Sequence, residues 1–90
     1  MTQPEVMRLV TANRLRDGVP VYRTSDGWSP AIADARLVVE DAAEDFLAAS
    51  QSGPRPLPVV APYVVEAVVE AGKVRPLALR ERIRAHGPTV

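Results

Sequence analysis

The stretch Arg8–Trp28 constrains the fold of this chain more than any other. Within it, two apolar-rich runs flank the short sequence Arg16-Asp17-Gly18. Glycine adopts a positive φ at no steric cost, so a three-residue loop that ends in glycine is typical of a β-hairpin closed by a bulge. A second turn, at Asp26-Gly27, leads to the only tryptophan, Trp28. We therefore expect a β-hairpin that begins a small sheet.

The rest of the chain predicts further strands and helices around that hairpin. The predicted strands are Arg8–Leu15, Val19–Thr24, Leu37–Val39, Pro62–Ala71 and Val74–Leu77. The predicted helices are one short turn from Ser29-Pro30 to about Ala35, a central helix that begins at Asp41, and a terminal helix Leu79–His86. Proline has no N–H to donate, so Pro20 and Pro76 should lie on strand edges or at a bulge. The segment Gly53–Pro58, which contains three prolines, should be an extended crossover.

The segment Pro62–Ala71 fits two interpretations. Its residues divide into two alternating sets, one for each face of a strand, but its four valines also have helical spacing behind a proline. Branching at Cβ restricts χ1 in a helix and favours a strand. We therefore interpret this segment as a strand.

The two main helices are predicted from capping and spacing. Asp41 is suited to accept backbone N–H groups at a helix start, with Glu44 three residues later to reciprocate. The inward face of this helix is predicted to comprise Ala43, Phe46, Leu47 and Ser50. In the terminal helix, Leu79 and Ile83 are expected to point inward, and Gly87-Pro88 to end it.

Together these elements predict an α+β fold. We expect a small antiparallel sheet of four to five strands, opened by the β-hairpin, with one or two helices on one face, namely one central helix and a short C-terminal helix. The 90 residues should form a single domain, 1–90, with residues 1–6 as a frayed lead-in.

Composition excludes several classes of function. The chain has no cysteine and its formal net charge is zero, which argues against disulfides and against a dedicated nucleic-acid binder. The charge is uneven, because residues 29–52 sum to −4 and residues 53–90 to +3. These segments could attract each other within the fold or across a homodimer. No apolar run is long enough to span a bilayer, and no signal peptide is recognisable, so we expect a cytoplasmic protein with no membrane partner.

Residues with catalytic chemistry are few. His86 is the only histidine, so a single chain has neither a His/Cys metal cluster nor a Cys–His pair. The paired acids at 40–41 and 44–45 are expected in the first turns of a helix, and neither GxGxxG nor a P-loop is present. We predict no catalytic residue, no metal and no cofactor, which argues against an enzyme.

Binding features are more prominent. The hairpin region contains Asn13, Arg14, Tyr22 and Trp28, and Trp, Tyr and Arg are common at protein interfaces. The alternative is that both aromatic rings fill a small core. Arg80 and Arg84 have i, i+4 spacing and share a helix face. They either form a solvated face or hold an anion or an acidic partner.

Three sequence motifs resemble a known family. They are T-A-N-R-L-R-D-G-x-x-V-Y from Thr11, G-W-S at 27–29, and L-R-E-R-I-R-A-x-G-P-T at 79–89. They are similar to short proteobacterial proteins of unknown function, typically encoded beside sulfite or nitrite reductase and siroheme-biosynthesis genes. The resemblance implies a cytoplasmic accessory role in assimilatory sulfur or nitrogen reduction, with the reductase as a partner. It carries over no catalytic residue.

The sequence thus leaves several functions open. The first is a non-enzymatic interaction module that docks onto a sulfite or nitrite reductase through the hairpin patch or the arginines of the terminal helix. The second is a sensor of a small anion or a nucleotide that uses arginine side chains. RNA or DNA binding through the basic C-terminal segment ranks third because the net charge is zero, and an enzyme ranks fourth.

Overall fold

The fold is an antiparallel sheet of five strands in the order β3-β2-β1-β4-β5, with helices packed on it, which confirms the predicted α+β class. A computed structural model describes residues 5–52 and 58–86. The strands are β1 (Met7–Arg14), β2 (Pro20–Arg23), β3 (Trp28–Ser29), β4 (Val59–Glu70) and β5 (Lys73–Pro76). The helices are the 3₁₀ turn η1 (Ile32–Asp34), α1 (Glu40–Ser50) and α2 (Leu79–His86). Residues 53–57 of the predicted crossover Gly53–Pro58, the stop at 87–88 and residues 1–4 lie outside the described residues.

The predicted hairpin is present as β1 and β2. Its loop places Gly18 at φ 74°, the left-handed conformation that glycine tolerates best. The Asp17 carboxylate accepts two hydrogen bonds from Arg14, both at 3.0 Å, and one from the Val19 N–H. Pro20 is the first residue of β2, where β3 does not yet pair with it, so the proline costs no ladder bond on that side.

The segment interpreted as a strand is β4, which begins three residues earlier than predicted. It pairs with β1 on one side and with β5 on the other. A two-residue turn joins β4 to β5, with Ala71 at φ 51° and Gly72 at φ 76°, as a type I′ turn requires. β5 is an edge strand, as Pro76 predicted.

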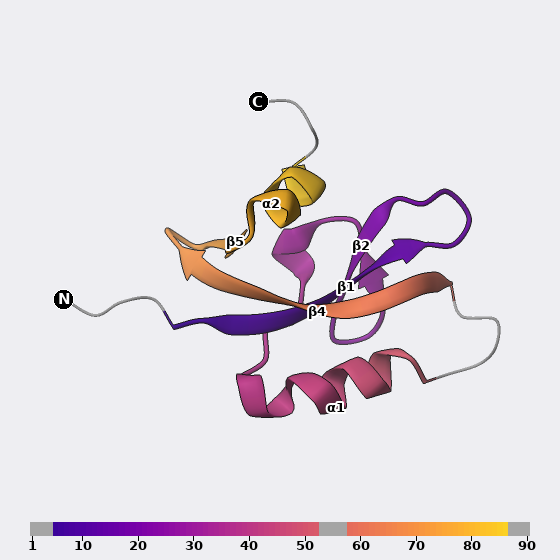
Figure 1. Cartoon of the computed structure of the whole chain (residues 1–90), viewed down its shortest axis with the longest axis horizontal. Coiled ribbons are helices and arrows are strands. Elements are labelled where there is room, and N and C mark those ends of the chain that lie inside the picture. The colour runs from indigo at the N-terminus through magenta and orange to yellow at the C-terminus, as the bar shows by residue number, and fades with distance from the viewer. Residues whose placement is uncertain (1–4, 53–57, 87–90) are drawn as a thin grey trace.

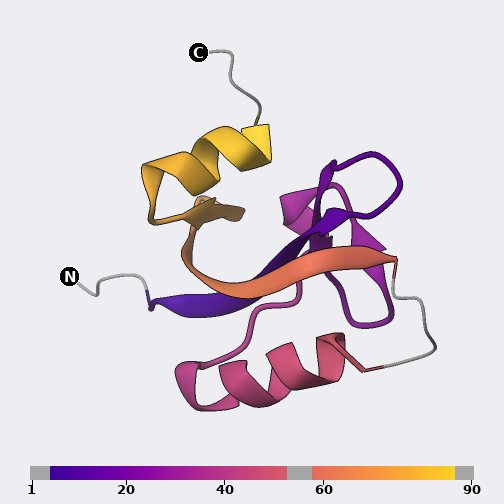
Figure 2. The same cartoon turned by 45° about the vertical axis from the view of Figure 1, so that its right-hand side comes forward.

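The two helices cover opposite faces of the sheet (Figures 1 and 2). The expectation that they share one face is therefore wrong. β1 explains the difference, because its central residues are buried on both sides. Leu9, Tyr22 and Val65 belong to a core cluster that Ala85 of α2 packs against. Ala12 and Val21 belong to a second cluster, with Val59 and Trp28, on the face that alternates with the first.

The start of α1 differs from its prediction. The helix begins at Glu40 after Val39, and no side chain caps it, so Asp41 is not the N-cap. The chain enters the helix directly from Val38, whose backbone exchanges two hydrogen bonds with Arg8, both at 2.8 Å. This constraint sets the first helical residue. The predicted inward face is confirmed, since Ala43 and Ser50 are buried.

Two shorter predictions also need correction. Leu37–Val39 is not a strand, because only Val38 forms a bridge, with Arg8, before the helix begins. Ser29 does not cap a helix that starts at Pro30, since it belongs to β3. Its hydroxyl instead accepts the Ala31 N–H and donates to Asp34, which delays the helical turn to Ile32.

Candidate functional site

The two large apolar side chains of the terminal helix α2 are exposed. Leu79 is 69% exposed and Ile83 is 41% exposed, whereas Glu81 is only 4% exposed. The prediction that Leu79 and Ile83 point inward is therefore wrong. The inward face of α2 is polar because charged side chains on it find hydrogen-bond partners on the sheet, as buried charges require.

Arg84 connects α2 to the first strand. Its Nη1 donates to the Thr11 hydroxyl at 2.6 Å, and its Nη2 donates to the Asn13 amide oxygen at 2.6 Å and to the Ala12 carbonyl at 3.1 Å. The Thr11 hydroxyl in turn donates to the Val21 carbonyl at 2.8 Å. The guanidinium thus connects α2 to polar groups of β1 and, through the Thr11 hydroxyl, to β2.

Glu81 connects α2 to β4. The Tyr63 hydroxyl donates to its carboxylate at 2.7 Å, and Arg84 and Arg80 each approach it to 3.6 Å. The Arg84 guanidinium also lies 5.5 Å from the centre of the Tyr63 ring, within range of a cation–π contact. We call Thr11, Asn13, Tyr63, Glu81 and Arg84 the buried polar cluster.

Both tyrosines hold their protons more tightly than a tyrosine in water. Burial raises the pKa of Tyr63, and its hydrogen bond to Glu81 raises it further. Burial also raises the pKa of Tyr22, which belongs to the core cluster on the same face. Both phenols are therefore neutral at physiological pH. The Tyr63 hydroxyl donates to Glu81, whereas the buried Tyr22 hydroxyl has no hydrogen-bond partner among the described residues.

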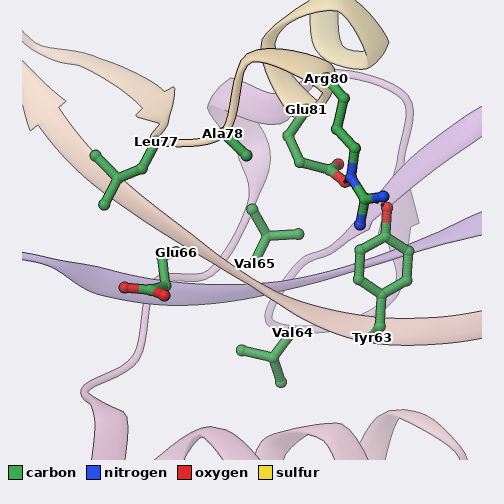
Figure 3. A pocket seen from close by; sticks show the side chains of 8 residues that line it. All are labelled: Tyr63, Val64, Val65, Glu66, Leu77, Ala78, Arg80 and Glu81. Carbon is green, nitrogen blue, oxygen red and sulfur yellow. Dashed lines mark hydrogen bonds and ion pairs between the residues drawn. The ribbon is translucent and has the colours of Figure 1, made fainter.

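A groove of about 410 Å³ lies beside the buried polar cluster, between β4 and the start of α2. Figure 3 shows its lining, in which the ends of Tyr63, Arg80 and Glu81 converge. Leu77 and Ala78 form another part of the wall. Arg80 has a side chain 85% exposed, so this guanidinium is accessible to a partner.

The structure separates the six residues that the sequence suggested as binding candidates. Asn13 and Arg84 bond to each other, and Tyr22 lies on the same face. Arg80 lines the groove. Arg14 bonds to Asp17 in the hairpin loop, and Trp28 packs with the other core cluster.

Sequence reasoning missed three members of the buried polar cluster, namely Thr11, Tyr63 and Glu81. Tyr63 lies in the alternating pattern that identifies the inward face of a strand, and this pattern was sufficient to identify it. Glu81 had none, because a glutamate next to two arginines in a short helix is indistinguishable from a solvated residue until the sheet is placed beneath it.

The chemistry of the site is that of attachment. Arg84 directs its donors at protein groups, so it holds α2 on the sheet.

Among residues 5–52 and 58–86, no three His, Cys, Asp or Glu side chains are grouped as metal ligands would be. In the same ranges, no helix is long and apolar enough to cross a membrane.

Comparison with known proteins gives one result. Residues 8–90 match a family described as "Protein of unknown function (DUF2849)". Comparisons with curated proteins and with solved structures found no match.

Proposed function

The chain belongs to the DUF2849 family, whose description assigns no activity, and we propose that it is a non-enzymatic module that docks onto another protein. The outer face of α2 carries this proposal. We call Leu79, Arg80 and Ile83 the α2 outer face, since all three are exposed. Covering a leucine or isoleucine side chain stabilises a complex by about 1.5–3 kcal/mol when the side chain becomes fully buried.

The required partner surface follows from this face. It must offer small or apolar side chains to Leu79 and Ile83 and a carboxylate to Arg80. A guanidinium that is this exposed gains most from a carboxylate with which it makes two parallel hydrogen bonds. Because the sequence motifs resemble proteins encoded beside sulfite or nitrite reductase genes, we propose such a reductase in the cytoplasm as the partner.

The alternative, a sensor of a small anion or a nucleotide, has less support. Arg84 directs its Nη groups at Thr11, Ala12 and Asn13, and the groove that contains Arg80 is also lined by two glutamates, Glu66 and Glu81. Negative charge in the lining opposes an anionic ligand.

The test is capture of the reductase by the tagged chain. From a host lysate at low ionic strength, we expect sulfite or nitrite reductase subunits to be recovered in near-stoichiometric amounts. Arg80→Glu should reduce recovery at least tenfold, because it reverses the charge that the α2 outer face presents.

Arg16→Glu is the matched control. Arg16 is similarly exposed, at 78%, but lies in the hairpin loop, so this variant should bind as the wild type does. Equal recovery with both variants would reject the α2 outer face as the docking surface. Absence of the reductase from the wild-type eluate would reject the reductase as the partner.

A further inference from the structure

The kind of surface that the α2 outer face requires is present on the chain itself. Along the outward side of α1, Asp41, Glu44, Asp45 and Ala48 are all exposed. Their spacing of three and four residues places them on one stripe of the helix. We call these four residues the α1 outer stripe. It combines carboxylates with a small side chain, against which a leucine or isoleucine packs closely.

The charges of the two helices are complementary. The α1 outer stripe carries three carboxylates, and the α2 outer face carries Arg80, with Arg82 half-buried along its other side. Opposite charges near a surface attract across a Debye length of about 8 Å at physiological salt. Each helix is thus a match for the other in charge and in side-chain size.

Within one chain these two surfaces are kept apart. The sheet separates α1 from α2 (Figures 1 and 2), and the residues of both outer surfaces are exposed. The α1 outer stripe and the α2 outer face can therefore meet only between two molecules.

We propose that the chain self-associates head to tail, with the α2 outer face of one copy on the α1 outer stripe of the next. A two-fold pairing of α2 with α2 would bring Arg80 of both copies together, and a pairing of α1 with α1 would oppose carboxylates. Both oppose like charges. In a pair joined in this way, one copy still has a free α2 outer face and the other has a free α1 outer stripe. The assembly therefore grows by adding further copies unless it closes into a ring.

The contact should be weak and sensitive to salt. Two short helices bury less than the roughly 1,200 Å² of a stable interface. Self-association should therefore appear between about 10 μM and about 1 mM protein. It should largely disappear at about 1 M salt, where the Debye length falls to about 3 Å.

Two variants test the direction of the contact. In the first, Leu79→Ser and Ile83→Ser disable the α2 outer face. In the second, Glu44→Gln and Asp45→Asn disable the α1 outer stripe and leave the first-turn acids in place. All four positions are exposed, and circular dichroism verifies that both variants fold.

Sedimentation velocity at low salt gives the readout. The average mass of the wild type should rise with concentration, and each variant alone should remain a monomer. Their equimolar mixture should form a 1:1 dimer and nothing larger, because each variant retains the surface that the other lacks.

Other results overturn the proposal. A wild type that stays monomeric at about 1 mM and low salt excludes self-association in the expected range. A second variant that associates by itself shows that the α1 outer stripe is not part of the contact. Neither result affects the docking proposal, which is tested on the reductase, although the two contacts use the same α2 face and exclude each other.

Discussion

At the scale of single residues, Glu81 and Arg84 are expected to have a large effect on stability. Both side chains are mostly removed from water, with exposures of 6% and 18%. Such a pair contributes little compared with an apolar pair of the same shape, but removing one partner leaves the other charge buried and unsatisfied. The attachment of α2 to the sheet therefore depends on every residue of the buried polar cluster.

Arg84→Met tests this dependence. The variant keeps an unbranched side chain but removes the charge that faces Glu81 and the donors to Thr11 and Asn13. We expect the free energy of unfolding to fall by about 3 kcal/mol in urea denaturation. Arg80→Met should change it by less than about 0.5 kcal/mol. Equal effects of the two substitutions would contradict the role of the cluster.

At the scale of elements, the turn between β4 and β5 contains avoidable strain. Ala71 adopts φ 51°, where its Cβ lies too close to the following carbonyl oxygen. The type I′ turn itself requires this positive φ. Asparagine tolerates this region and is favoured in type I′ turns. The hairpin forms despite this residue because Gly72 supplies the second positive φ.

Ala71→Asn should stabilise the chain. We expect the free energy of unfolding to rise by about 0.5–1 kcal/mol, measured by thermal denaturation. The converse substitution, Gly72→Ala, should lower it by about 1 kcal/mol through backbone strain alone, since an added Cβ meets no atom within 4 Å. A loss of stability in Ala71→Asn would show that the turn conformation is not the one described.

Elements were predictable where their signals are local. The alternation of β4 and the glycine turns at Gly18 and Gly72 lie within a few residues, so β1, β2, β4 and β5 were identified as strands, whereas the short β3 was not. The start of α1 was not, because Val38 pairs with Arg8, thirty residues earlier in the chain, and this long-range bridge decides where the helix begins.

At the scale of the whole molecule, one face of the sheet contains both tyrosines. The pKa of each is raised, by burial in the case of Tyr22 and by burial and the Glu81 hydrogen bond in the case of Tyr63. The folded chain thus binds these protons more tightly than the unfolded chain. This contribution to stability is complete below the ordinary tyrosine pKa of about 10 and is lost as the pH rises through the folded values.

The chain should therefore lose stability in alkali. We expect the urea midpoint to fall as the pH rises above about 10, with phenolate absorbance appearing as the chain unfolds. Tyr63→Phe should make this pH dependence less steep, because Tyr22 is then the only tyrosine whose proton the folded chain binds more tightly than the unfolded chain. A midpoint that is independent of pH in this range would contradict the raised pKa values.

The sequence by itself determined the hairpin of β1 and β2, the edge position of β5 and the α+β class, because turn chemistry, proline and side-chain alternation act over a few residues. It did not predict β3. It also determined that α1 and α2 carry opposite charges. Only the tertiary structure decided that the helices lie on opposite faces and that α2 turns its polar side inward. The reason is that Glu81 and Arg84 are stabilised in the interior by Tyr63, Thr11 and Asn13, which lie far from them in the chain and become neighbours only when the sheet has formed.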